Sequence, residues 1–322
     1  MTLAASHPAQ PAMPPAVPPA VHSVDEFVLE VPDLAEARRF YTHFGLDVRD
    51  EGPGLALYTH GHAHRWARIL AGPAKRLAWL SLGIHADDAE RFAQHLAARG
   101  IARTEAPAGA DAGGLWITGP DALALQLRVA GKCSPSQPAP REAAPANHNA
   151  GRAPTRSQAQ PTRPLYLSHI LLFSADVDAA RAFYEGVLGL RLSDRSGSAI
   201  AFLHTPHGSD HHLIALARSG AGGLHHSSWC VPSLDAVGIG AQQMAQAGYT
   251  QGWGLGRHVL GSNYFRYVRD PWGSYAEYSY DIDFVEAGQT WPAADHPGED
   301  ALYVWGPALP ADFITNHEQA AA

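Results

Sequence analysis

Short apolar runs alternate along the chain with segments in which apolar residues recur at helical spacing. The run FVLEV at 27–31 predicts a strand, and a helix is expected from Asp33, which can cap its first turn. The apolar positions of this helix lie three or four residues apart: Leu34, Ala37, Phe40, Tyr41 and Phe44. A second helix is expected over 86–99, before Gly100, and residues 116–121 and 124–127 are expected to form a closing hairpin.

The same pattern occurs twice. PDLAEARRFYTHFGL in the first half matches ADVDAARAFYEGVLGL in the second, so that Asp33 corresponds to Asp176. Residues 86–100 match 234–248 in the same way. Each half therefore contains two strand–helix–strands units. This repeat predicts an α+β fold of two domains, in which paired units form an incomplete barrel around a central cleft.

Changes in composition divide the chain into five segments. Residues 1–23 are rich in Ala and Pro, lack the cationic start of a signal peptide and are expected to be a disordered leader. Two domains, 24–131 and 165–285, are separated by a linker over 132–164 with almost no large apolar residues. Residues 286–322 form a tail whose aromatic residues are expected to pack on the body.

The charge balance narrows the class of partner. The formal net charge is −8, which disfavours a nucleic acid or an anionic membrane. No apolar run approaches the ~18 residues that a membrane-spanning helix needs. The chain has only two cysteines, Cys133 and Cys230, so we expect a cytoplasmic protein without a disulfide framework. We also expect a homo-oligomer.

The stretch 256–278, GRHVLGSNYFRYVRDPWGSYAEY, carries the densest candidate chemistry. Its Asp-Pro-Trp-Gly segment is typical of a turn, and the aromatic and β-branched residues on either side predict a β-hairpin. Alternation puts Tyr267 on one face of the first strand and Glu277 on an aromatic face of the second. A buried carboxylate without a partner costs several kcal/mol. Glu277 therefore needs a partner, either an arginine such as Arg266 or Arg269, or a metal ion.

The same stretch resembles the signature of type I extradiol ring-cleavage dioxygenases, in the vicinal oxygen chelate superfamily. Five parts of that signature fall in register: Gly256-Arg257-His258, Tyr267, Asp270-Pro271, Gly273 and Glu277. Arg266 departs from the pattern, which has an apolar residue there, but alternation points Arg266 away from the Tyr267 face. The resemblance covers roughly residues 24–285 and implies four βαβββ modules, two in each domain.

The resemblance implies a metal centre in the second domain. His169, His226 and Glu277 lie on equivalent strands of its paired modules and are expected to point into one cleft. Two histidines and one carboxylate form the facial triad of non-haem Fe(II) oxygenases, and Mn(II) suits the same ligands. The family register favours His226 over its neighbour His225. The alternative is that these histidines belong to the core and bind no metal.

The first domain provides a comparison for this ligand set. Aligning the two halves places three of its residues opposite the three ligands: Glu26, Ala78 and Gln126. That set is not one that binds a metal, so the first domain is expected to be metal-free and structural.

Three further residues match active-site positions of the family: His212, His258 and Tyr267. His212 resembles the histidine beside the oxygen site and would donate a proton there, although its neighbour His211 stays open as the alternative. His258 and Tyr267 resemble the pair that hydrogen-bonds the substrate. The resemblance thus implies an Fe(II)-dependent dioxygenase that cleaves a catecholic substrate with O2 to a 2-hydroxymuconic semialdehyde-type product, as in metapyrocatechases and biphenyl-2,3-diol dioxygenases.

Two other functions remain open. A glyoxalase-type lyase or isomerase would use four protein ligands and no O2, so a demand for O2 separates it from a dioxygenase. A binding protein of the bleomycin-resistance type needs no metal, so metal analysis separates it from both enzymes.

Overall fold

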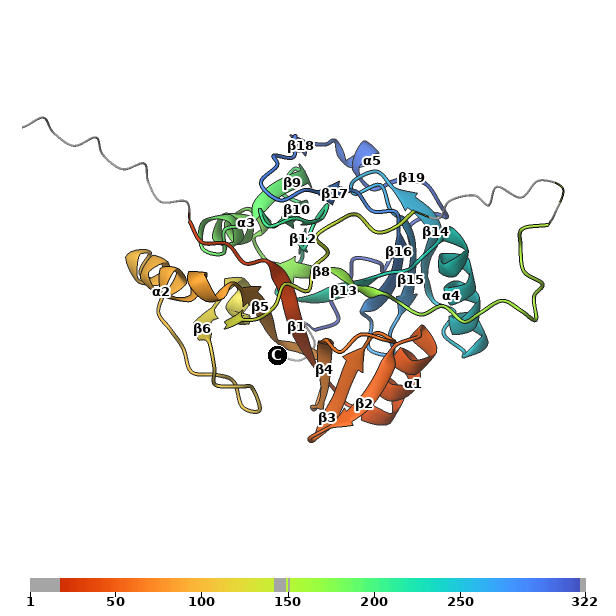
Figure 1. Cartoon of the computed structure of the whole chain (residues 1–322), viewed down its shortest axis with the longest axis horizontal. Coiled ribbons are helices and arrows are strands. Elements are labelled where there is room, and N and C mark those ends of the chain that lie inside the picture. Colours follow the sequence, from red (N-terminus) through yellow and green to blue (C-terminus); the bar gives the residue numbers. More distant parts are fainter. Residues whose placement is uncertain (1–17, 142–148, 150, 319–322) are drawn as a thin grey trace, which may run out of the picture.

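Two mixed β-sheets form the body of the molecule in the computed structural model, which describes residues 18–141, 149 and 151–318 (Figure 1). Strands predominate and a few short helices cover them, so the expected α+β fold is confirmed. No helix in the described residues is long and apolar enough to cross a membrane.

The first domain is a seven-stranded sheet in the order β2-β3-β4-β1-β5-β7-β6. Its strands are β1 (Ser23–Val31), β2 (Asp47–Glu51), β3 (Gly54–Tyr58), β4 (Arg65–Ala71), β5 (Arg76–Ile84), β6 (Leu115–Thr118) and β7 (Ala124–Val129). Its α-helices are α1 (Leu34–Phe44) and α2 (Ala89–Ala98). The second module is reduced, because a single bridge between Arg103 and Ile117 takes the place of its first strand after the helix.

The second domain is a ten-stranded sheet in the order β18-β9-β10-β12-β8-β13-β16-β15-β14-β19. Its strands before residue 286 are β8 (Tyr166–Ser174), β9 (Arg191–Ser196), β10 (Ile200–His204), β12 (Ile214–Arg218), β13 (Gly223–Cys230), β14 (Gly252–His258), β15 (Tyr264–Arg269) and β16 (Tyr275–Tyr280). Its helices are α3 (Val177–Gly186) and α4 (Leu234–Gln246). Two short strands, β11 (Ser209–Asp210) and β17 (Phe284–Val285), pair separately.

The helix that opens each domain begins in the same way. Asp33 accepts hydrogen bonds from the amides of Ala35 and Glu36, at 2.8 and 3.0 Å, and Asp176 accepts one from Ala179 at 3.0 Å. Each carboxylate satisfies amides that the first helical turn leaves without partners. The internal repeat read from the sequence is therefore present in the structure down to its capping residues.

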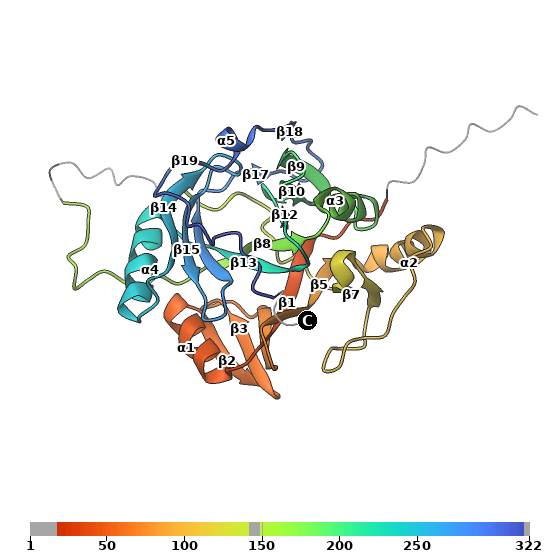
Figure 2. The same cartoon turned by 180° about the vertical axis from the view of Figure 1, so that it is seen from behind.

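The two domains share one hydrophobic core. The Phe44 ring of α1 stacks on Tyr278 of β16 with centroids 4.0 Å apart, and Phe27 of β1 meets Trp229 of β13 edge-on. The helices α1 and α4 lie side by side in both views (Figures 1 and 2). This contact holds the second domain, with its candidate site, against a rigid partner.

Part of the expected leader is a structural element. Residues 1–17 lie outside the described residues, but Pro19 to His22 are buried between the two domains and β1 begins at Ser23. The amide of Val21 donates to the carbonyl of Leu188, and that of His22 donates to Gly83. The expectation of disorder is wrong for these residues, because their backbone pairs with both domains.

The ends of the expected linker are also held. Ser134 is buried and donates to the His22 carbonyl at 2.6 Å. At the other end Thr162 is buried, and its carbonyl lies against Gly45, the residue that caps α1 with a φ of 97°. A Cβ at Gly45 would lie 2.1 Å from that carbonyl oxygen, so only glycine fits there.

The C-terminal tail adds a strand to each edge of the ten-stranded sheet. Its elements are β18 (Ala294–Asp295), α5 (Gly298–Ala301) and β19 (Tyr303–Trp305), which lie together beside β9 and β14 (Figure 1). Strand β18 pairs with β9 and β19 with β14. Glu318, the last described residue of the tail, forms a buried ion pair with Lys75 of the first domain at 2.6 Å.

Candidate metal centre and active site

Three neighbouring strands at the centre of the second sheet each contribute one candidate ligand. His169 lies on β8, His226 on β13 and Glu277 on β16. Strand β13 runs between the other two, and its Ser228 is paired with both His169 and Glu277. The pairing therefore brings all three side chains to one point in the sheet.

The three side chains form a compact, buried cluster. The Nε2 atoms of His169 and His226 are 3.3 Å apart, and they lie 3.4 and 3.5 Å from Oε2 of Glu277. A cation bound to nitrogen and oxygen at about 2.0–2.2 Å has ligand atoms roughly 3 Å apart, so this spacing suits one ion. All three residues are almost inaccessible to solvent.

The Glu277 carboxylate shows that the cluster fits a cation. Its Oε1 accepts a hydrogen bond from Asn263 at 3.1 Å, whereas its buried Oε2 has no hydrogen-bond donor. Burial raises the pKa of Glu277, but the adjacent His169 lowers it more, so the group is ionised. An ionised oxygen that faces two imidazole nitrogens and lacks a donor can hold a divalent cation.

Neither arginine considered as a partner reaches Glu277. Arg266 donates to the carbonyl of Gly254 at 3.0 Å, and Arg269 pairs with Asp312 at 2.6 Å. The departure of Arg266 from the family pattern leaves the site untouched, because its side chain lies on the other face of β15.

The three candidate catalytic residues surround the cluster. The His212 ring lies 3.9 Å from that of His169, centroid to centroid. Tyr267 donates from its hydroxyl to Nε2 of His258 at 2.9 Å, and the same Nε2 lies 3.8 Å from Glu277. Burial lowers the pKa of His212 well below its usual range and also lowers that of His258, so both rings are neutral.

The structure distinguishes His212 from His211. The His212 side chain lines the cavity described below, whereas Nε2 of His211 lies 2.9 Å from a carboxylate oxygen of Asp194, away from that cavity. Sequence reasoning chose His212 but missed Asp194. It also missed Asn263, which donates to Glu277.

A cavity of about 240 Å³ opens from the cluster. Its polar lining comes from five histidines, Tyr267, Asn263 and Ser196, and the remainder is aliphatic or aromatic. The described residues that line it include no Lys, Arg, Asp or Glu. The tail closes one side, with Gly298, Ala301, Leu302, Leu309, Phe313 and Ile314. Such a space suits a flat apolar ring better than a charged molecule.

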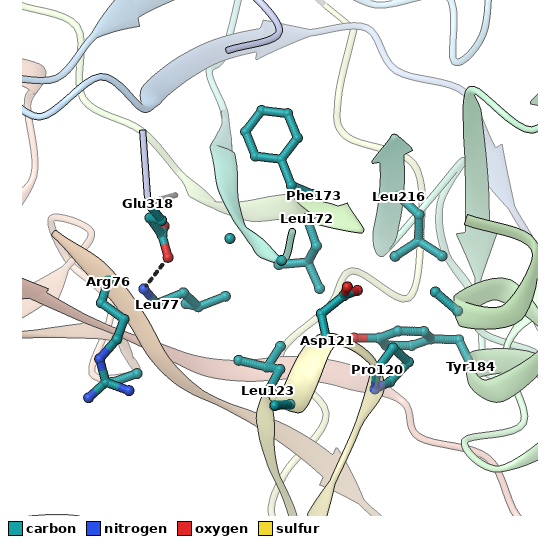
Figure 3. Close-up of a pocket in the computed structure, with 15 residues that line it drawn as sticks. Arg76, Leu77, Pro120, Asp121, Leu123, Leu172, Phe173, Tyr184, Leu216 and Glu318 are labelled. Atoms are coloured by element: carbon teal, nitrogen blue, oxygen red, sulfur yellow. Dashed lines mark hydrogen bonds between the residues drawn. The ribbon is translucent and has the colours of Figure 1, made fainter. Parts of the chain in front are cut away.

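A second cavity, of about 230 Å³, lies where the domains meet (Figure 3). Its wall is apolar around Leu172 and Leu216, and Arg76, Asp121 and Glu318 border it. Glu318 accepts a hydrogen bond from the amide of Leu77 at 2.9 Å, the dashed line in Figure 3. None of the candidate metal ligands lines this cavity, so we assign the chemistry to the first one.

The first domain has different residues at the equivalent positions. Glu26 and Gln126 both pair with Ser81, as His169 and Glu277 pair with Ser228. Glu26 forms ion pairs with two arginines, and Gln126 accepts from Ser81 at 2.6 Å.

The residue opposite His226 is Trp79, which is a correction to the expected Ala78. Trp79 lies two residues before Ser81, as His226 lies two before Ser228. The expected match was counted back from residues 86 and 234, which lie five residues after Ser81 and six residues after Ser228, so the count misses by one. The correction leaves the first domain without an equivalent ligand set.

A separate group of potential ligands in the first domain is already engaged. Asp25, His64 and Cys133 lie together, but Arg128 pairs with the Asp25 carboxylate. Nε2 of His64 donates to the Asp25 carbonyl at 2.8 Å, and Sγ of Cys133 donates to that of Val24. These contacts leave the group as a structural contact between β1 and the start of the linker.

Comparisons with known proteins agree with this geometry. The model of the Glyoxalase/Bleomycin resistance protein/Dioxygenase superfamily matches residues 23–127 and 166–278. Metapyrocatechase 2 of Cupriavidus necator is 52% identical over 301 residues, 93% of each chain. Among solved structures, the Mn(II)-bound glyoxalase from Novosphingobium aromaticivorans has a TM-score of 0.71 at 24% identity, covering 90% of this chain and 92% of its own. The 2,2',3-trihydroxybiphenyl 1,2-dioxygenase from Sphingomonas wittichii strain RW1 has a TM-score of 0.69 at 22% identity, covering 90% and 100%.

Proposed function

We propose that this protein uses Fe(II) and O2 to open a catechol ring. The premise is that the chain belongs to the Glyoxalase/Bleomycin resistance protein/Dioxygenase superfamily and is an extradiol dioxygenase. The bond broken is the one beside the two hydroxylated carbons, and the product is a 2-hydroxymuconic semialdehyde. The observation that carries this proposal is the buried Oε2 of Glu277, which has no donor and faces the Nε2 atoms of His169 and His226.

The metal ligands and the residues next to them have different roles in the proposed reaction. Fe(II), when bound by His169, His226 and Glu277, would bring both catechol oxygens and O2 to one centre and lower the pKa of a bound hydroxyl. Mn(II) suits the same donors. His258 and Tyr267, already hydrogen-bonded to each other, would orient the ring, and His212 would hold or deliver the proton.

The cavity lining favours a catechol with an uncharged substituent. Its aliphatic and aromatic lining offers no described cation to pair with a carboxylate, and burying an unpaired carboxylate costs several kcal/mol. Catechol, alkylcatechols and 2,3-dihydroxybiphenyl would therefore be accepted, and catechols that bear a carboxylate would be rejected.

The experiment is to load the protein with Fe(II) under anaerobic conditions and then add each catechol in air. Neutral catechols should give a yellow product and consume one O2 per ring, whereas 3,4-dihydroxybenzoate should give little of either. A parallel Mn(II)-loaded sample identifies the working metal. Failure of every catechol in the Fe(II)- and Mn(II)-loaded protein would refute the proposal.

The likeness to a Mn(II)-bound glyoxalase gives a second candidate, a metal-dependent lyase or isomerase. The triad offers three protein ligands rather than the four of the glyoxalase type, and His212 stands beside it as a proton carrier, which favours the dioxygenase. A binding protein without metal would have no need of the unpartnered Glu277 oxygen. Turnover that needs no O2 would favour the lyase.

We also propose that the chain works as a cytoplasmic homo-oligomer. Both cysteines are free, as in a reducing compartment. Val304 and Trp305 expose 63% and 45% of their surface on the edge strand β19, and such an apolar edge is a surface on which a second copy can dock. Light scattering of the wild type and of Val304→Glu tests this: the variant should have the lower mass.

A further inference from the structure

Two pairs of adjacent histidines are joined through their Nδ1 atoms. Nδ1 of His225 lies 2.7 Å from Nδ1 of His226, and Nδ1 of His211 lies 3.1 Å from Nδ1 of His212. Two ring nitrogens form a hydrogen bond only if one carries a proton and the other does not. The hydrogen bond that Nε2 of His225 or of His211 makes to a third group therefore decides which ring of the pair donates to the other.

For the first pair, that far contact is made by the C-terminal tail. Nε2 of His225 lies 2.8 Å from the carbonyl oxygen of Phe313, which can only accept, so Nε2 must donate. A neutral imidazole carries one proton, which here lies on Nε2, so Nδ1 of His225 can only accept a hydrogen bond. His226 must then donate from Nδ1, which leaves its Nε2 unprotonated and directed at Glu277.

The tail also fixes the tautomer of His258. Nδ1 of His258 lies 2.7 Å from the carbonyl oxygen of Leu302 and must donate to it. A neutral His258 ring then has its one proton on Nδ1, so its Nε2 accepts a hydrogen bond from the Tyr267 hydroxyl at 2.9 Å. The proton of the Tyr267–His258 pair thus has a defined position in the resting site.

The second pair is fixed through Asp194. Burial raises the pKa of this carboxyl, but hydrogen bonds from His211, His296, Ala294 and Trp291 lower it more, to about 2. The ionised carboxylate accepts from Nε2 of His211, and a ring that carries its one proton there accepts at Nδ1 from Nδ1 of His212. Nε2 of His212 then carries no proton.

Three groups of the tail hold Asp194 from its other sides. Trp291 donates from Nε1 at 3.0 Å, the amide of Ala294 at 3.0 Å and Nε2 of His296 at 2.9 Å. The carboxylate that orients His211 is therefore also the anchor of strand β18. His169 differs from the other active-site histidines, because its Nδ1 contacts Ser168 of its own strand at 3.3 Å.

We propose that residues 291–313, which lie beyond the family-matched modules, set the proton positions of the active site. The carbonyls of Phe313 and Leu302, together with the tail groups that donate to Asp194, hold His226, His258 and His212 in the Nδ1–H tautomer. The Nε2 atom of each of these three rings is therefore unprotonated. Asp194, His211 and His225 are positioning residues that act through these three. The part that they play in turnover rests on the proposed function, but the tautomers are a property of the metal-free chain.

The first test reads the tautomers directly. In the metal-free protein labelled with [15N]histidine, long-range 15N–1H spectra distinguish Nδ1–H from Nε2–H rings. Each signal is assigned by its loss in the corresponding His→Gln variant. His212, His226 and His258 should all carry the proton on Nδ1 at neutral pH. An Nε2–H form of any of the three would overturn the proposal, whether or not the protein is a dioxygenase.

The second test removes the outer partner of the metal ligand. His225→Phe keeps a ring among Phe173, Tyr275 and Phe313 but offers no acceptor to His226. His226 should then populate both tautomers, and Fe(II) affinity, measured by competition with a chelator, should fall about 10–100-fold. The His169 signal should not change. Wild-type iron affinity together with an unchanged His226 tautomer would overturn this part.

The third test separates orientation from simple loosening of the tail. Asp194→Asn should give mixed tautomers at His212 and lower kcat more than it changes KM or iron content. The matched control is Asp295→Asn, which removes the ion pair with Arg195 from the same strand without touching a histidine. If the control has the same spectra and the same kcat as Asp194→Asn, the effect comes from tail docking alone and the proposal fails.

Discussion

The Glu277 carboxylate illustrates how function and stability oppose each other at single residues. Its Oε2 is buried without a donor, a state that costs free energy in the metal-free protein. Replacing a buried charge by an apolar side chain of similar size is often neutral or stabilising. The residue most needed for a metal centre is therefore also one that the metal-free fold tolerates poorly.

This conflict gives a prediction for Glu277→Leu. The variant should bind no Fe(II) and have no activity, yet its metal-free form should melt at or above the wild-type temperature. Fe(II) should raise the melting temperature of the wild type, because a ligand that binds only the folded state stabilises it. Anaerobic thermal melts with and without Fe(II), together with elemental analysis, check this. An equal rise in the variant would show that Glu277 is not a ligand.

A second residue prediction concerns His212. His212→Phe should retain iron and bind catechol without O2, but lose about 10²–10⁴-fold in kcat, the usual contribution of a general acid or base. His211→Phe should lose less, since His211 contacts Asp194 rather than the cavity. The measurement is kcat, iron content and anaerobic catechol affinity for both. Normal turnover in both variants would remove the acid–base role from this segment.

At the residue scale, the motif was a better guide than residue counting. The signature and the module repeat led to all six candidate residues that the structure brings together. The assignment of Ala78 failed by one position because the connection from strand to helix is one residue longer after Ser228 than after Ser81. Asp194 escaped notice, and His211 and His225 were considered only as alternatives to their neighbours. Their importance depends on tail atoms 88 to 102 residues away, and no local pattern records such contacts.

At the scale of elements, local chemistry was enough to predict the parts that repeat. Asp33 and Asp176 cap the first helix of each domain, and the Asp-Pro-Trp-Gly turn joins β15 to β16. The tail was expected only to pack, but it adds strands β18 and β19 to the sheet edges. These strands are two and three residues long, too short to show alternation, so only the edges that they pair with define them.

The last described residue of the tail, Glu318, gives a prediction at the scale of elements. Glu318 and Lys75 form a buried ion pair, with 7% and 3% of their side-chain surface exposed. Glu318→Ala leaves the lysine charge buried without its partner and should lower the free energy of unfolding by about 3–5 kcal/mol. The double variant Lys75→Met, Glu318→Leu should recover most of this loss.

Asp312→Ala is the matched control for that pair. It removes an ion pair with Arg269 from the same tail, but Asp312 is half exposed, so the loss should be at most about 1 kcal/mol. Urea unfolding of all variants makes the comparison. A Glu318→Ala loss no larger than the control would mean that the tail end contributes little to holding the two domains together.

At the scale of the whole molecule, residues 19–22 join the two domains. Thr205 of the second domain donates to the Val21 carbonyl at 2.6 Å, and His207 contacts that of Ala20 at 3.1 Å. On the other side the His22 ring packs against Gly83, where a Cβ would come within 2.4 Å. An Ala- and Pro-rich composition indicated disorder because such residues carry little apolar surface. It could not reveal a segment held by backbone hydrogen bonds.

His22 makes this junction sensitive to acid. The ring is fully buried, 4.5 Å from His85 by centroid distance, and burial together with the charge of His85 lowers its pKa to about 4. Between pH 6.5 and 4, His22 is protonated in the unfolded chain but stays neutral in the folded chain. The free energy of unfolding must therefore fall as the pH falls through this window, by up to about 1.4 kcal/mol per pH unit for each such group, and be independent of His22 above it.

The last prediction concerns the slope of the free energy of unfolding against pH. Buried His204 and His225, whose pKa values burial also lowers to about 4, contribute to the same slope, so His22→Gln should flatten the curve without abolishing it. His60→Gln, in an exposed loop, is the control and should leave the slope unchanged. Urea unfolding of the metal-free protein at pH 4.5, 5.5, 6.5 and 7.5 supplies the curve. The quantity compared is the slope, because the absolute stability of His22→Gln also reflects the lost packing on Gly83. A slope in His22→Gln equal to that of the wild type would show that the junction takes up its proton without cost. In that case the buried histidine at the junction would have no part in the acid sensitivity of the fold.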